Sequence, residues 1–122
     1  MLLIRNRIGH QAEWTPERHT QFLNACETYV NGLKTEGRLH SAQPLVREGV
    51  MVSRTEDGWK EIPFNEGNEV IVGYYHIYAN GMEDAVAIAK RNPEFTFGTT
   101  ARVEVRHVKT KEASTGFVYP AQ

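Results

Sequence analysis

Residues 61–108 contain the order of segments that most limits the possible folds. A strand-forming run at 70–78 is followed by a helical pattern at 82–89, by Pro93, and by an alternating run at 100–108. Pro93 cannot continue a helix, because its ring nitrogen has no hydrogen to donate. A strand, a helix and a returning strand in this order form half of a split β-α-β sandwich.

The first part of the chain predicts a similar unit. Residues 1–8 favour a strand, and residues 15–36 favour a helix. Thr15 can cap the free backbone N–H groups, and Pro16 suits the first helical position. Apolar residues spaced by three and four positions predict the buried face of this helix: Phe22, Cys26, Tyr29, Val30 and Leu33.

A hairpin interrupts the middle of the chain. After a strand at 39–46, the runs 50–55 and 59–62 flank Glu56-Asp57-Gly58. Asp-Gly is a strong hairpin turn signal, because both residues tolerate positive φ.

The second helix has a candidate cap and a candidate buried face. Asn80 precedes it, with Glu83 three residues later, close to a capping-box arrangement. The expected buried residues are Met82, Ala85, Val86 and Ala89.

Together these segments predict an α+β fold of the ferredoxin-like β-α-β-β-α-β type, with the hairpin as an addition. Two helices would cover one face of the sheet, and the other face would be left to a partner or a pocket. The domain would span residues 1–109. Residues 110–122 would form either a frayed tail or an arm that docks on a neighbouring subunit.

Composition excludes several classes of protein. The chain has 122 residues, 40% of them hydrophobic, which suits one core. With 14 basic and 15 acidic residues the net charge is -1, so we expect no nucleic-acid partner. No apolar stretch reaches the roughly 20 residues of a membrane span, and the apolar start is too short for a signal peptide. We therefore expect no membrane partner and a location in a reducing cytoplasm.

Metal and disulfide sites are not expected either. Cys26 is the single cysteine, which precludes an internal disulfide and a multi-cysteine metal site. The five histidines lack the spacing of a compact zinc motif. Because no cofactor-binding fingerprint is present, we expect no cofactor.

Several short elements, taken in order, resemble the YCII-related (DGPF-type) domain family. The elements are residues 1–4, Pro16-Glu17, 36–39, Pro44-Leu45, 63–66, 73–75, Ala85 with Ala89, and 103–106. The resemblance implies a bacterial, cytoplasmic protein that pairs through its open sheet face into a dimeric α+β barrel.

The resemblance also implies a catalytic pair that this chain only partly contains. The better-studied branch of the family has a His and an Asp proposed to be catalytic, and His19 lies roughly where that His falls. The Asp would fall near Asn92, but an Asn can neither take a proton nor orient an imidazole by charge. The family's Asp-Gly before Pro-Phe is Glu61-Ile62 here.

Two residues are candidates for acid–base chemistry. His19 lies in the first turn of a helix, and its alternative interpretation is simple solvent exposure. Glu66 lies in a loop after Pro63-Phe64, where loops held by a scaffold often carry function, or where the side chain is only solvated.

Strand residues are candidates for ligand binding. We expect His76 and Tyr74 to lie on the same strand face, opposite Tyr75, and His40 to face the same way as Ala42. Both histidines could instead be ordinary hydrogen-bonded packing residues.

A second group of candidate ligand-binding residues lies near the end of the sheet. Glu104 and Arg106 share one strand face, where Arg106 could bind a carboxylate or form a surface ion pair. Tyr75 and Arg106 could line one pocket.

The sequence thus leaves two functions open. The first is binding of a small polar or aromatic molecule between the sheet face and a dimer mate, with weak acid–base catalysis. The second is a non-catalytic interaction or regulatory module linked to transcription.

Overall fold

The computed structural model describes residues 1–64 and 69–120, and within these it contains six strands and three helices. Their bounds are β1 Leu2–Arg7, α1 Pro16–Thr35, β2 Leu39–Pro44, β3 Val50–Thr55, β4 Gly58–Pro63, β5 Glu69–Ile77, α2 Met82–Lys90, α3 Glu94–Phe97 and β6 Arg102–Val105. The fold is therefore α+β.

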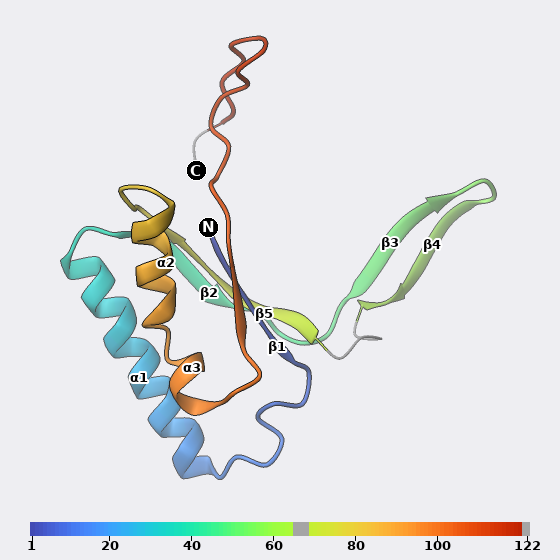
Figure 1. The fold of residues 1–122 in the computed structure, drawn as a ribbon. Helices are drawn as coiled ribbons and strands as arrows, with labels where there is room; N and C mark the ends of the chain where they lie inside the picture. The colour runs from blue at the N-terminus through green and yellow to red at the C-terminus, as the bar shows by residue number, and fades with distance from the viewer. Residues whose placement is uncertain (65–68, 121–122) are drawn as a thin grey trace.

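Four strands form the main sheet in the order β2-β5-β1-β6, and every neighbouring pair is antiparallel. Helices α1 and α2 lie on one face of this sheet (Figure 1). The strands β3 and β4 form a separate two-stranded sheet. One face of the main sheet thus packs against helices within the chain.

Helix α1 begins as the sequence predicts. The Thr15 side chain accepts a hydrogen bond from the Arg18 N–H at 3.1 Å, and Pro16 occupies the first helical position. Leu33 is buried in the core and Phe22 is buried beside the Trp14 and Phe97 rings, while Cys26, Tyr29 and Val30 of the same stripe are half-buried. The stripe therefore faces the sheet, as predicted.

The core lies between the helices and the sheet. Its buried residues come from β1, α1, β5 and α2: Leu2, Ile4, Leu33, Val70, Val72, Ile77, Ile88 and Ala89. Each Leu, Ile or Val side chain among them contributes roughly 1.5–3 kcal/mol when it leaves water. These core contacts pack α1 against β5, which positions the site described below.

The turn of the β3–β4 hairpin differs from the prediction. Thr55 pairs with Gly58, so Glu56 and Asp57 form the two-residue turn. Gly58 has a φ of 126°, and among the described residues only glycines have positive φ. Of the two residues that tolerate positive φ, only Gly58 adopts it, and Asp57 does not.

The start of α2 also differs from the prediction. Its N-cap is Gly81, and Asn80 makes no side-chain cap. Instead the Asp84 carboxylate accepts a hydrogen bond from the Asn80 backbone N–H at 2.8 Å. Met82, expected to be buried, is exposed, and Ile88 fills the core in its place.

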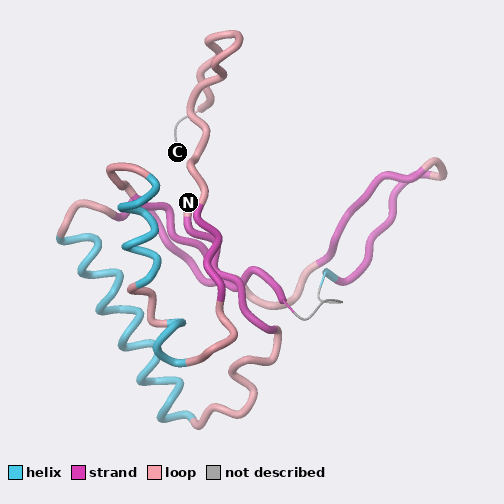
Figure 2. Tube along the Cα trace, viewed as in Figure 1, coloured by secondary structure: helices cyan, strands magenta, loops and turns pink. Residues whose placement is uncertain are grey.

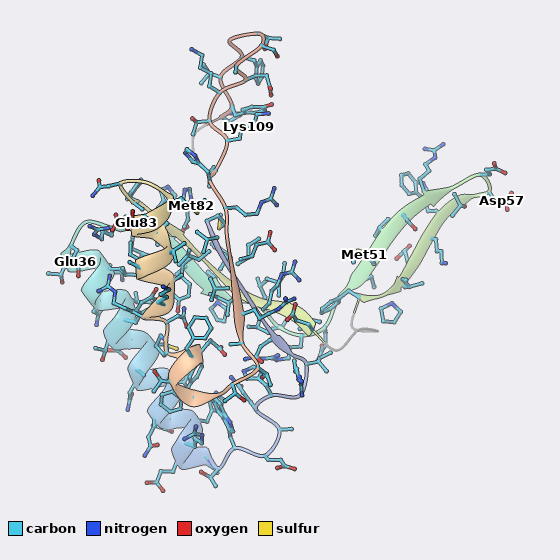
Figure 3. All side chains as sticks on the ribbon, in the orientation of Figure 1. Glu36, Met51, Asp57, Met82, Glu83 and Lys109 are labelled. Atoms are coloured by element: carbon cyan, nitrogen blue, oxygen red, sulfur yellow. The ribbon has the colours of Figure 1, made fainter. Side chains whose placement is uncertain are left out.

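Two segments extend from the body of the molecule (Figure 2). One is the β3–β4 hairpin, where Figure 3 marks Met51 and Asp57. The other follows β6 beyond Lys109 and folds back on itself, with Lys111 paired to Val118 and the Tyr119 N–H donating to the Thr110 carbonyl at 2.9 Å. Residues 110–120 therefore form a small hairpin.

Candidate functional site

A cavity of about 670 Å³ lies between α1 and the β2–β5 side of the sheet. Its apolar walls include Phe22, Val30, Val72 and Pro44, and its polar lining includes His19, Glu27, Arg47, Tyr75, Asn92 and Glu94. His19 and Glu27 are exposed and Asn92 and Glu94 are buried, so the opening lies at α1 and the floor at residues 92–94. The volume suits a small organic ligand.

Asn92 places a buried amide at this floor. The residue is 2% exposed, and its Oδ1 accepts a hydrogen bond from the Glu94 N–H at 2.9 Å. A backbone N–H can only donate, so the oxygen of the amide is fixed there and Nδ2 is the free end. Nδ2 makes no well-aligned hydrogen bond among the described residues, but the amide lies near the Tyr29 and Tyr75 hydroxyls and opposes the rise in their pKa values.

Glu94 is held by a second buried asparagine. Asn6, 1% exposed, donates from Nδ2 to Glu94 Oε2 at 2.8 Å. The Asn6 oxygen accepts from the Arg7 N–H at 2.8 Å and from the Thr100 hydroxyl at 2.6 Å. These bonds fix the orientation of Asn6 and connect β1 to the segment between α3 and β6.

His10 completes this polar cluster. Its Nδ1 lies 3.1 Å from the Arg7 carbonyl oxygen, which can only accept, so Nδ1 carries the proton. Nε2 then lies 3.5 Å from Glu94 Oε2 and makes no hydrogen bond. The two titratable side chains therefore face each other inside the protein.

The pKa values of the neighbouring groups keep them protonated. Burial raises the pKa of the Cys26 thiol to about 11, and the nearby Glu94 carboxylate adds to the shift. Burial likewise raises the pKa of Tyr75, with further contributions from Cys26 and Tyr29. Tyr75 thus presents a phenolic O–H donor to the cavity, and Cys26 an unreactive thiol.

The buried imidazole of His10 predicts a pH dependence of stability. Burial lowers the pKa of His10 below 6.5, and the Glu94 carboxylate only partly opposes this effect. As the pH falls below about 6.5, the unfolded chain therefore binds a proton that the folded protein resists. We expect the free energy of unfolding to decrease from pH 7 to pH 5, measured by urea unfolding.

A histidine variant checks the origin of this slope. His10→Asn keeps an N–H for the Arg7 carbonyl but does not titrate, so its stability should depend less on pH. The pKa of His76 is also lowered, by burial and by His40, so His76→Asn removes a separate share. A His10→Asn slope equal to that of the native protein would contradict the assignment.

The residues predicted from the sequence do not all meet in one place. His19 and Tyr75 line the cavity. Glu66 lies outside the described residues. The prediction that Tyr75 and Arg106 line one pocket is wrong, because Tyr75 packs against the core on the helix side.

Arg106 and Glu104 belong to an ion-pair network associated with the opposite face of the sheet. Arg106 lies 3.7 Å from Glu104, and Arg5 donates to Glu104 at 3.1 Å. Arg102 binds Glu69 through two hydrogen bonds of 2.8 and 2.7 Å, which lower the pKa of that carboxyl. These half-buried and exposed groups satisfy one another, as the surface-ion-pair interpretation predicts.

His40 and His76 lie together on that open face, with ring centroids 4.4 Å apart. Ala42 pairs with Tyr75 in the register and so faces the helices. The prediction that His40 faces the same way as Ala42 is wrong, because the register shifts between Leu39 and Ser41.

Sequence reasoning missed the buried polar groups Asn6, His10 and Glu94. Asn6 follows Leu2 and Ile4 on the inward-facing side of β1, which is a signal the alternation could have given. Glu94 follows Asn92-Pro93 and shows no periodic pattern. Its position depends on contacts with β1, far away in the sequence.

Neither a metal site nor a membrane helix is found in the described part of the chain. Residues 1–64 and 69–120 contain no group of three or more His, Cys, Asp or Glu side chains that could hold a metal ion. None of the helices described there is long and apolar enough to cross a membrane.

Comparisons with known proteins add no assignment. The chain matches no model of a known protein family, and a search of curated proteins finds no relative.

Proposed function

We propose that the protein binds a small, largely apolar molecule in the cavity between α1 and the sheet. The observation that carries this proposal is the floor, where a buried amide and a buried carboxylate open onto apolar walls. Ligand pockets are typically apolar with a few polar groups that fix the orientation of the ligand, so this lining favours a ligand. A ligand with a polar group at one end would complete this site.

The ligand's chemistry follows from the floor and the walls. Phe22 and Val72 favour an aromatic or aliphatic body. Glu94 accepts hydrogen bonds and Tyr75 donates them, so a hydroxyl or N–H group suits this end of the cavity. A carboxylate ligand is disfavoured there, because it would face Glu94 without a cation at the floor.

The neutral alcohol 2-naphthol tests this proposal, because it combines a bicyclic aromatic body with one O–H donor. In a titration followed by ¹⁵N–¹H correlation spectra, we expect saturable shifts of the amides of Cys26, Tyr75 and Glu94. Amides of Val52 and Phe117, on the two extended hairpins, should stay in place. Shifts confined to those hairpins would contradict the proposal.

We also propose a ferredoxin-like, YCII-related domain that pairs into a dimeric α+β barrel in the cytoplasm. The strand order β2-β5-β1-β6, with two helices on one face, supports the ferredoxin-like part. The half-buried Leu3, Ile71 and Tyr74 on the other face would be covered by a second subunit. Native mass spectrometry should then show a dimer, and a monomer at micromolar concentration would contradict pairing.

A second candidate function is a non-catalytic interaction module. The observation that favours it is the β3–β4 hairpin, where Val50, Met51, Val52 and Trp59 are each more than half exposed. An isolated two-stranded hairpin is marginally stable in water, so an apolar one benefits from a partner. This function would be favoured if a partner copurified with the native protein but not with Trp59→Ser, and if 2-naphthol shifted none of the amides around the cavity.

A further inference from the structure

The carboxylate of Glu94 is both anchored and accessible. Asn6 donates to Oε2, while the residue as a whole lines the cavity beside α1. Glu94 is 8% exposed, so little water lies between its carboxylate and a bound molecule. A fixed position within reach of the ligand is what a general base requires.

The His10–Glu94 pair also connects two cavities. His10 lines a second cavity of about 700 Å³, together with Arg7, Trp14, Phe97 and Thr100, while Glu94 lines the first. At the boundary between the two cavities, His10 Nε2 lies 3.5 Å from Glu94 Oε2. A proton taken up by Glu94 therefore has an acceptor that leads away from the ligand.

We propose that Glu94 is a catalytic base that removes a proton from the molecule bound in the first cavity, with Asn6 as the residue that positions its carboxylate and His10 as the acceptor of its proton. This inference rests on the proposed function and adds a reaction class to it, proton abstraction leading to isomerisation or elimination. Tyr75 donates its phenolic O–H to the oxygen on which negative charge develops.

The charged and titratable surroundings of the pair come from several elements. Arg47, in the segment after β2, lowers the proton affinity of His10 by its positive charge. The Glu94 carboxylate adds to the rise in the pKa of Cys26 of α1 and of Tyr75 of β5, and both groups are neutral at pH 7. His10 is therefore the titratable neighbour that faces the Glu94 carboxylate directly.

The probe 5-nitrobenzisoxazole tests the inference, because a single base converts it. Glu94 takes the proton from C3, the C–H electron pair forms the nitrile, and the N–O bond breaks to release 2-cyano-4-nitrophenolate. The Glu94 carboxylic acid then returns its proton through His10 to water. The coloured phenolate gives the rate directly.

We expect saturable conversion by the native protein and a kcat about 100-fold lower in Glu94→Gln, within the usual range for a general base. Gln keeps an oxygen for Asn6, so the fold should persist, which circular dichroism checks. The matched control is Glu83→Gln, an exposed carboxylate at the start of α2 that should leave the rate unchanged.

The role of His10 has its own readout. In His10→Asn the pH–rate profile should have one ionisation fewer than in the native protein, which a purely structural role would not produce. An unchanged profile would contradict a role for His10 as the proton acceptor.

Two failures can be told apart. If 2-naphthol shifts the amides around the cavity but Glu94→Gln converts the probe as fast as the native protein, the catalytic inference is wrong and the binding function stands. If 2-naphthol does not bind in the cavity, the proposed function is wrong, and the inference fails with it.

Discussion

Replacing Asn6 with Ala is expected to lower the free energy of unfolding by about 3 kcal/mol. The substitution removes three hydrogen bonds at once, to the Arg7 N–H, the Thr100 hydroxyl and the Glu94 carboxylate. Because all three partners lie near a buried position, water cannot replace Asn6 without opening the packing. Urea unfolding followed by far-UV circular dichroism measures the loss.

The matched control for this prediction is Asn24→Ala. Asn24 is exposed on α1, so its removal should change stability by no more than about 0.5 kcal/mol. Ala is also the better helix former, which favours a small gain. If Asn6→Ala cost no more than Asn24→Ala, the buried polar cluster would not stabilise the fold as described.

Filling the cavity is expected to abolish binding while the fold persists. Ala42 lines the cavity from β2, and a Trp there would occupy space that the ligand needs. β2 lies at the edge of the sheet and can shift outward, so overpacking should cost only about 1–3 kcal/mol. We expect the affinity for 2-naphthol to fall at least about tenfold, a loss of roughly 1.4 kcal/mol.

Ala87→Trp is the control for added bulk and added aromatic surface. Ala87 is exposed on α2 and does not line the cavity, so its variant should bind 2-naphthol as the native protein does. Equal binding by Ala42→Trp and Ala87→Trp would show that the ligand lies elsewhere.

Local patterns predict most of the elements, because each depends on neighbouring residues. Thr15-Pro16 begins α1, and the Phe22–Leu33 stripe turns it toward the sheet, through capping and periodicity alone. The prediction for the start of α2 is wrong, because a tertiary contact determines the structure there. The Asp84 carboxylate binds Arg38 at 2.7 Å and also accepts from the Asn80 N–H, so this carboxylate, rather than the Asn80 side chain, fixes the start of the helix.

The candidate site is less predictable, because its members come from distant parts of the chain. His19 and Tyr75 could be named from helix and strand positions, and both line the cavity. Asn6 and Glu94 are separated by 88 positions and meet only when β1 lies beneath the segment after α2. Periodicity identifies which residues face inward, but not which inward polar residues meet.

The open face of the sheet illustrates a second limit. Alternation along β6 correctly predicts that Glu104 lies on the face opposite Val103 and Val105, since the valines pack on the core. It does not reveal that Arg5 of β1 and Arg106 already neutralise Glu104. A charged face expected to bind a ligand thus carries intramolecular ion pairs, which shifts the candidate site to the helix side.

Intermolecular NOEs between 2-naphthol and the isotope-labelled protein test the central claim most directly. A ligand between α1 and the sheet should give NOEs to the side chains of Phe22, Val30 and Val72, which line that cavity. NOEs to Leu3 and Ile71 instead would place the ligand on the open face of the sheet and contradict the site described here.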